Sequence, residues 1–130
     1  MTARASDLEQ EVDRILGRPF RWLERGPAYF YCLGVWLYLM DRRGIHVEDP
    51  FIEASEARLC RFWRLFQEVP KDALLPYDLL YWRWADQSHV VVVTSGRWAV
   101  SCSEQLGVHR TPLRLATVRA EKAYRYQGAS

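Results

Sequence analysis

Apolar residues recur at helical spacing in the first half of the chain. In the first segment Leu8, Val12 and Ile15 fall on one helical face, and Gly17 ends the pattern. A nearly unbroken apolar run follows and ends at Arg42-Arg43-Gly44, basic residues and a glycine that are typical of a helix C-terminus. The pattern predicts three helices, the second of them buried: Asp7–Leu16, Tyr31–Arg43 and Glu53–Phe66.

After Pro76 the apolar period changes to that of strands. Short runs rich in valine and aromatic residues alternate with polar or glycine-bearing turns, and Ser95-Gly96 is typical of a hairpin tip. Four strands are predicted: Leu79–Trp84, His89–Thr94, Arg97–Cys102 and Gly107–Thr111. Helices followed by strands predict an α+β domain, with the second helix packed on an antiparallel meander.

Composition fits one globular domain over residues 1–130. With 49% hydrophobic and 14% aromatic residues, the chain can bury a core. All but two of its 18 basic residues are arginine, yet they are scattered among 16 acidic residues and the net charge is only +2. Scattered charge argues against nucleic acid as a partner, because phosphate binding needs clustered charge. The longest apolar run, Ala28–Met40, is too short to span a membrane.

The first residues contain no apolar stretch that resembles a secretion signal. We therefore expect a chain that is made in the cytoplasm and stays there unless something carries it out. Cys32, Cys60 and Cys102 lack metal-type spacing, so free thiols are expected, with Cys60 as a packing residue. His46 and His109 are expected to be surface residues, and no metal or cofactor is predicted.

Two residues suggest chemistry. Cys32 lies at the start of the second helix, where the partial positive charge of the helix end favours a thiolate. His89 opens a valine strand and offers an imidazole as a base. Taken alone, each residue fits a simpler interpretation: Cys32 as a buried packing residue and His89 as a solvated loop residue.

Taken together with their neighbours, the two residues resemble the NlpC-type cysteine peptidases of the papain-like fold. The resemblance runs from about Leu16 to Arg125 and rests on the order and spacing of several segments. These are Leu16-Gly17-Arg18-Pro19-Phe20-Arg21-Trp22, Tyr31-Cys32-Leu33-Gly34-Val35, Gly44-Ile45, Leu75-Pro76-Tyr77-Asp78-Leu79-Leu80, Ser88-His89-Val90, Gly107-Val108 and Arg119 to Arg125.

The resemblance implies that Cys32 is a nucleophile and His89 its general base. It implies a bacterial cell-wall stem peptide as substrate. In the family a third polar group lies twelve positions after the histidine, which is Ser101 here, and orients the imidazole. Strand parity leaves an alternative: a two-residue Ser95-Gly96 turn would place Cys102 on the face of His89, whereas a three-residue loop or a bulge would place Ser101 there.

The sequence departs from the family pattern around the nucleophile. The family aspartate before the cysteine is Tyr31, the serine after it is Leu33, and a tyrosine of the opening segment is Phe20. Three functions remain open: a cell-wall cysteine peptidase, a silent structural module of the same fold, and a thiol acyltransferase or amidase on another substrate. By analogy with small phage-associated members, we expect a phage or phage-like tail tip as the setting, with tail or baseplate proteins as partners.

Overall fold

The computed structural model describes residues 5–84 and 87–128. Within them the elements are, in chain order, α1 (Ala5–Ile15), α2 (Cys32–Arg42), α3 (Glu56–Trp63), β1 (Phe66–Val69), β2 (Leu79–Trp84), β3 (Gln87–Val93), β4 (Trp98–Ser103), β5 (Gly107–Pro112), α4 (Leu113–Arg119) and β6 (Lys122–Tyr126). None of the helices in this part of the chain has the length and apolar character needed to cross a bilayer.

The strands form one antiparallel sheet in the order β1-β6-β2-β3-β4-β5. Its β2-β3-β4-β5 part is the predicted meander, so the expected α+β architecture is confirmed. The sequence did not predict β1 and β6, which extend the sheet beyond β2, or α4, which links β5 to β6.

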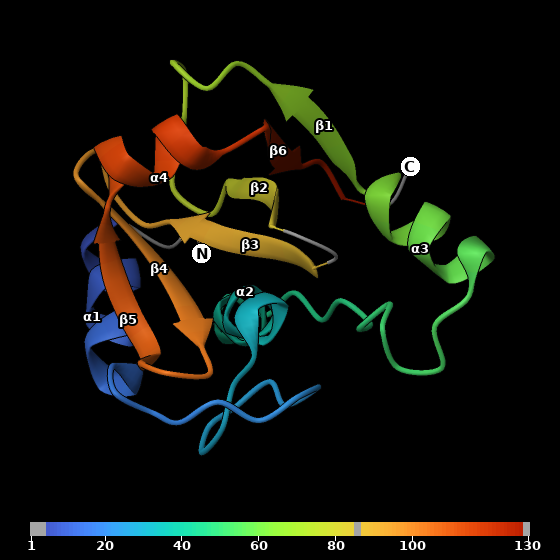
Figure 1. The fold of residues 1–130 in the computed structure, drawn as a ribbon, viewed down its shortest axis with the longest axis horizontal. Helices are drawn as coiled ribbons and strands as arrows, with labels where there is room; N and C mark the ends of the chain where they lie inside the picture. Colours follow the sequence, from blue (N-terminus) through green and yellow to red (C-terminus); the bar gives the residue numbers. More distant parts are fainter. Residues whose placement is uncertain (1–4, 85–86, 129–130) are drawn as a thin grey trace.

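The sheet is covered on both faces, with α2 on one side and α4 on the other (Figure 1). Alternating strand residues separate into two clusters, as the two-residue period of a strand requires. On the α2 side lie Leu79, Val90, Val92, Val100, Cys102 and Val108, and on the α4 side lie Leu80, Val91, Val93 and Ala99 with Ala116 and Ala120. The main core is therefore between α2 and the sheet.

The third helix is shorter than predicted at both ends. It begins after Ser55, whose hydroxyl accepts the Arg58 N–H at 3.1 Å and caps the helix. It ends at Trp63, and Phe66 already belongs to β1. The rings of Trp63 and Phe66 still pack together, with centroids 5.6 Å apart. The apolar spacing that predicted a continued helix is therefore also compatible with a helix that ends at Trp63 and a strand that begins at Phe66.

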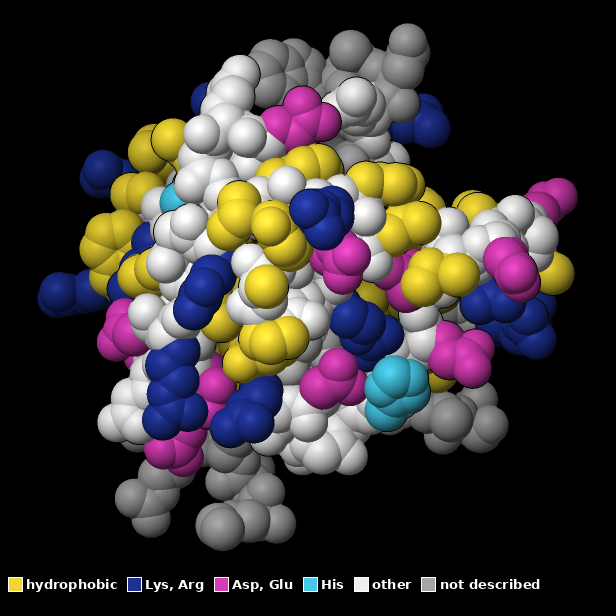
Figure 2. Space-filling view, turned by 90° about the horizontal axis from the view of Figure 1, so that it is seen from below, with side chains coloured by type: hydrophobic (Ala, Val, Ile, Leu, Met, Phe, Trp, Pro, Cys, Tyr) yellow, Lys and Arg dark blue, Asp and Glu magenta, His cyan; other side chains and the backbone are white. Residues whose placement is uncertain are grey.

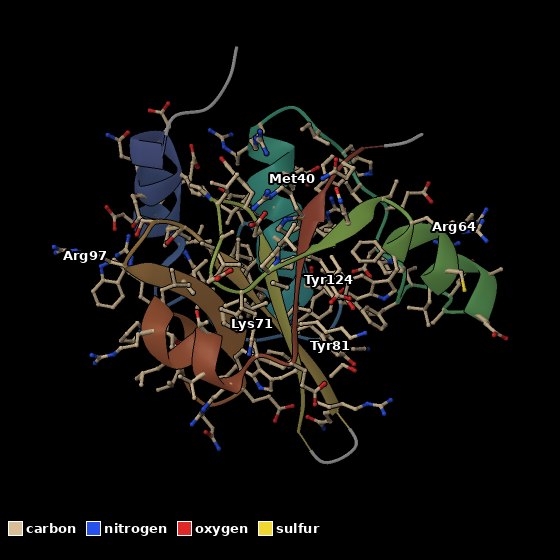
Figure 3. The ribbon with its side chains drawn as sticks, turned by 90° about the horizontal axis from the view of Figure 1, so that it is seen from above. Met40, Arg64, Lys71, Tyr81, Arg97 and Tyr124 are labelled. Carbon is tan, nitrogen blue, oxygen red and sulfur yellow. The ribbon has the colours of Figure 1, made fainter. Side chains whose placement is uncertain are left out.

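The α3 side of the molecule is held by aromatic packing. Tyr81 on β2 and Tyr124 on β6 lie on neighbouring strands, and both rings contact Trp63, at 6.1 and 4.8 Å between centroids (Figure 3). Arg64, just beyond the end of α3, points away from the sheet (Figure 3). The helix is therefore anchored along one side and open along the others.

Asp78 fastens the C-terminal strand to the turn before β2. Its buried carboxylate accepts the Leu75 N–H at 2.8 Å and two bonds from the Arg125 guanidinium, at 3.0 and 2.9 Å. The same guanidinium donates to the Ala73 carbonyl at 2.8 Å. Asp78 is thus a structural residue that connects β6 to the 73–78 turn.

Candidate active site

Cys32 is the first residue of α2, and no side chain caps this helix end. Tyr31 occupies the N-cap in extended conformation (φ −120°, ψ 179°) without a side-chain hydrogen bond to the first turn. The backbone N–H of Tyr31 donates to the Glu24 carbonyl at 3.1 Å, which holds the preceding loop against the helix. The uncapped N–H groups and the partial positive charge of the helix end therefore lie at the Cys32 thiol.

Gly34 allows the loop to approach this closely. A Cβ atom at position 34 would lie 2.1 Å from the Glu24 carbonyl oxygen. Real side-chain atoms do not come so close to a backbone oxygen, so only glycine fits the first turn of α2 here. The residue after Cys32, Leu33, is buried in the core.

His89 lies on β3 and is held by Ser101 on β4. The Ser101 Oγ and His89 Nε2 are 2.8 Å apart, and the same Oγ lies 3.4 Å from the Val90 carbonyl oxygen. A serine hydroxyl has one proton, and if it donates that proton to Val90 it must accept from His89 Nε2–H. In that arrangement Nδ1 carries the free lone pair.

The hairpin between β3 and β4 determines which residue meets His89. Val93 pairs with Ala99, and the Thr94 N–H donates to the Trp98 carbonyl at 3.0 Å, so the loop is residues 95–97. A three-residue loop places Ser101 on the face of His89. Cys102 points to the opposite face, where its buried thiol donates to the Phe30 carbonyl at 3.3 Å.

Cys32 packs against the α2-side cluster, whereas the His89 ring packs against Trp82 of the other cluster, with centroids 5.1 Å apart, so the link between the two residues that the structure shows runs through the backbone of β3. The Val90 N–H, directly after His89, interacts favourably with the Cys32 sulfur, as do the N–H groups of Leu33 and Cys32 itself. No hydrogen bond joins the thiol to the imidazole among the residues that the structure describes. Catalytic contacts are often loose in the absence of substrate and tighten in the complex.

Both groups are neutral near pH 7. Burial raises the pKa of the Cys32 thiol, and Asp49 raises it further, more than the nearby backbone N–H groups lower it. Burial, with a smaller contribution from His109, lowers the pKa of His89 to about 4. The expected thiolate is therefore wrong for the free protein, because desolvation outweighs the helix end. The imidazole is neutral, and the burial that keeps it neutral also makes it a weak base.

A buried pair lies behind the nucleophile. The Tyr31 hydroxyl donates a short hydrogen bond to Asp49, which also accepts the Phe51 N–H at 2.9 Å. Burial and this bond raise the pKa of Tyr31 well above its usual value. The Tyr31 ring packs edge-on against Trp22, with centroids 5.0 Å apart. The residue directly before Cys32 is thus a packed, neutral side chain.

Sequence reasoning missed two residues near this site. Asp49 was interpreted only as part of an Asp-Pro turn, and its burial beside Tyr31 has no local sequence signal. His109 was expected on the surface, but it is the cross-strand partner of Ser101, half-buried, with Nδ1 2.9 Å from the Gly107 carbonyl oxygen. Alternation along β5 and the pairing with β4 would have placed it on the Ser101 face.

The other cysteine and the cavities lie away from this site. Cys60 was expected to be a packing residue, but it is exposed on the outer side of α3. All three thiols are free. Two cavities flank α3, and neither Cys32 nor His89 lines them. Within residues 5–84 and 87–128, no three histidine, cysteine or acidic side chains come together as a metal site.

The sequence matches no protein-family model, and no curated protein matches it significantly. The fold of the chain, however, matches those of several solved structures. The NlpC/p60 domain of the peptidoglycan hydrolase SagA superposes with a TM-score of 0.68 at 15% identity, over 95% of this chain and 99% of that one. The chain has the NlpC/p60 fold. The NlpC-type architecture expected from the sequence is thereby confirmed.

Two longer proteins share this fold. An NlpC/p60 family protein from Bacillus cereus has a TM-score of 0.73 at 22% identity, and NlpC2 from Trichomonas vaginalis has 0.71 at 16%. The alignments cover 98% and 94% of this chain, but only 41% and 46% of those proteins. The chain therefore corresponds to less than half the length of either.

Proposed function

We propose that this protein is a cysteine hydrolase that cleaves an amide bond in the peptide part of the bacterial cell wall. Cys32 is the nucleophile, His89 the general base and Ser101 the group that orients the imidazole. The observation that carries the proposal is the 2.8 Å contact between Ser101 Oγ and His89 Nε2, which leaves Nδ1 free as a base. The peptidoglycan hydrolase SagA, whose NlpC/p60 domain has this fold, supports the choice of substrate.

The reaction begins from neutral groups. His89 Nδ1 accepts the thiol proton as the Cys32 sulfur attacks the amide carbonyl carbon, and N–H groups at the start of α2 stabilise the oxyanion. The imidazolium then gives its proton to the leaving amine, and a thioester remains. Water, deprotonated by His89, attacks the thioester and releases the acid and the free thiol. Ser101 accepts from Nε2–H throughout.

The substrate is tested by digestion of purified cell wall. Soluble products are separated by chromatography and identified by mass spectrometry. The proposal predicts fragments that differ from the wall peptides by one water and carry a new amine and a new carboxylate. Products joined to an added amine instead of water would identify an acyltransferase. Intact wall peptides after long incubation would contradict the proposed substrate.

A second candidate is a catalytically silent module of the same fold. It is favoured by the raised pKa of Cys32, by the missing thiol–imidazole hydrogen bond among the described residues, and by the packed side chains at Tyr31, Leu33 and Phe20. In this case the protein would serve as an assembly part. It would leave wall peptides intact and still bind its partner proteins.

We further propose, by analogy alone, that the protein is made in the cytoplasm and works in the tail tip or baseplate of a phage or phage-like particle. Quantitative mass spectrometry of purified particles tests this setting. The proposal predicts the protein at a fixed ratio to the tail proteins. Its absence from intact particles, with free protein in the lysate, would contradict the tail setting and leave the proposed chemistry untouched.

A further inference from the structure

A cavity of about 300 Å³ lies beside α3, away from Cys32 and His89. Its walls come from three places in the sequence: the inner side of α3, the segment 46–50, and the end of β6 at Tyr126. Its size is at the lower end of the range for small-ligand sites. Leu65 and Tyr126 give it an apolar part that is fixed by the sheet, since the Gln127 N–H donates to the Leu65 carbonyl at 2.7 Å.

Two arginines form one wall of this cavity. Arg58 and Arg61 are three residues apart, so they lie on the same face of α3. Arg61 forms no ion pair with the described residues. Arg58 has only a 4.0 Å contact with Glu48, whose side chain is 84% exposed. Figure 2 shows Lys and Arg side chains spread over this face of the molecule, with acidic side chains among them on the α3 side.

The opposite wall of the cavity contains Glu48 and Asp49, and both acidic side chains already have partners in the fold. Asp49 accepts from the Tyr31 hydroxyl and from the Phe51 N–H, and no ion pair joins it to either arginine among the described residues. Of the other ionisable groups of this wall, Glu48 contacts Arg58 at 4.0 Å and His46 is 3.0 Å from Asp41. Among the described residues, Arg61 is therefore the cation of the cavity without an ion-pair partner, and Arg58 has only the exposed Glu48.

We propose that this cavity binds a carboxylate group, of a small acid or of a peptide C-terminus, between Arg58 and Arg61. The planar guanidinium fork matches the two oxygens of a carboxylate. Glu48 and Asp49 across the cavity repel a dianion more strongly than a monoanion, so a carboxylate fits better than a phosphate. The apolar surface of Leu65 and Tyr126 receives the carbon part of the ligand. The inference does not depend on Cys32 being catalytic.

The test uses nuclear magnetic resonance titration of the full chain. The probe is N-acetyl-alanyl-alanine, which ends in a carboxylate, and the comparison is its C-terminal amide. Signals from Leu65 and from residues 46–50 report on the cavity. The variant R61Q removes one guanidinium that supports no contact in the fold. The matched control is R64Q, because Arg64 is also exposed but lines the hollow on the other side of α3.

We expect saturable shifts with the acid and binding weaker by about tenfold or more with the amide. R61Q should weaken binding of the acid by a similar factor, R58Q/R61Q should abolish it, and R64Q should bind as the wild type does. No saturable shift, equal binding of acid and amide, or equal loss in R61Q and R64Q would overturn the proposal. Tighter binding of inorganic phosphate than of the acid would overturn the choice of a carboxylate.

Discussion

The protonation of the His89 imidazole makes the free energy of unfolding depend on pH. Its pKa falls from 6.5 to about 4 on folding, because burial disfavours the charged ring. Between these values the unfolded chain binds a proton that the folded chain does not, so His89 contributes stability at neutral pH that is lost as the pH falls. The group that the proposed mechanism needs as a base is thus kept neutral by the same burial.

The first prediction compares the wild type with His89→Gln by denaturant unfolding at several pH values. As the pH falls from 6.5 towards 4, the wild type should lose unfolding free energy relative to the variant, by at most about 1.4 kcal/mol per pH unit. The difference between the two proteins removes the contribution of the other titrating groups. A difference that stays constant across this range would contradict the lowered pKa.

The thiols should differ in reactivity with iodoacetamide. Because only the thiolate reacts, the raised pKa of Cys32 and the pKa of about 11 for Cys102 predict slow alkylation at pH 7. Exposed Cys60 should react first. Peptide mapping by mass spectrometry measures each rate, and the Cys32 rate should rise about tenfold per pH unit above neutrality. Faster alkylation of Cys32 than of Cys60 at pH 7 would indicate a preformed thiolate.

At the scale of single residues, the sequence predicted the contact of Ser101 with His89 and missed the residues packed behind Cys32. Cys32 and His89 have local signals, a helix start and a strand start. The choice between Ser101 and Cys102 depended on the length of one loop. Asp49 could not be predicted, since its contact with Tyr31 joins segments that only the folded chain brings together.

Among the elements, the first turn of α2 depends most on one small residue. Gly34→Ala would place a Cβ 2.1 Å from the Glu24 carbonyl oxygen and force the loop and helix apart. We expect a loss of about 2–3 kcal/mol in unfolding free energy, as for overpacked sites. The loop before α2 should shift together with Cys32.

The control is Gly96→Ala, in the hairpin loop. A Cβ at position 96 meets no atom within 4 Å, and the backbone there is not left-handed. This variant should stay within about 0.5 kcal/mol of the wild type in denaturant unfolding. Equal stability of the two variants would contradict the close approach of loop and helix.

Some element boundaries could not be predicted from periodicity. Phe62, Trp63 and Phe66 fit a helical face, yet the chain turns into β1 after Trp63. All three rings still reach one aromatic cluster, with Phe62 and Phe66 centroids 5.0 Å apart. Apolar spacing measures what is buried, and here both conformations bury the same rings.

For the whole molecule, β6 lies between β1 and β2 in the sheet, and Arg125 anchors it to the turn before β2. Arg125→Met would leave the buried Asp78 carboxylate without its charged partner. Removing one member of a buried pair costs several kcal/mol, and because Arg125 is partly exposed we expect about 2–3 kcal/mol. Lys122→Met on the same strand breaks only an exposed 3.8 Å pair and should cost less than about 1 kcal/mol. Denaturant unfolding of both variants measures this, and similar losses would contradict a structural role for Asp78.

The sequence predicted the meander and its covering helix, but not the full sheet. β1 and β6 pair residues that are far apart in the sequence, Phe66 with Tyr126 and Val69 with Ala123, and no local pattern encodes such a contact. α4 is a seven-residue helix with one buried residue, Ala116, and so has little amphipathic signal. Long-range pairing and short helices are decided by the tertiary structure.

The central claim is that Cys32 is a hydrolytic nucleophile, with His89 as its base and Ser101 orienting the imidazole. It is tested most directly by peptide release from purified cell wall with the wild type, Cys32→Ala and the matched control Cys60→Ala. The account predicts release by the wild type and Cys60→Ala, and at least about a thousandfold slower release by Cys32→Ala. Equal release by Cys32→Ala and the wild type would contradict it, as would the absence of release by all three proteins.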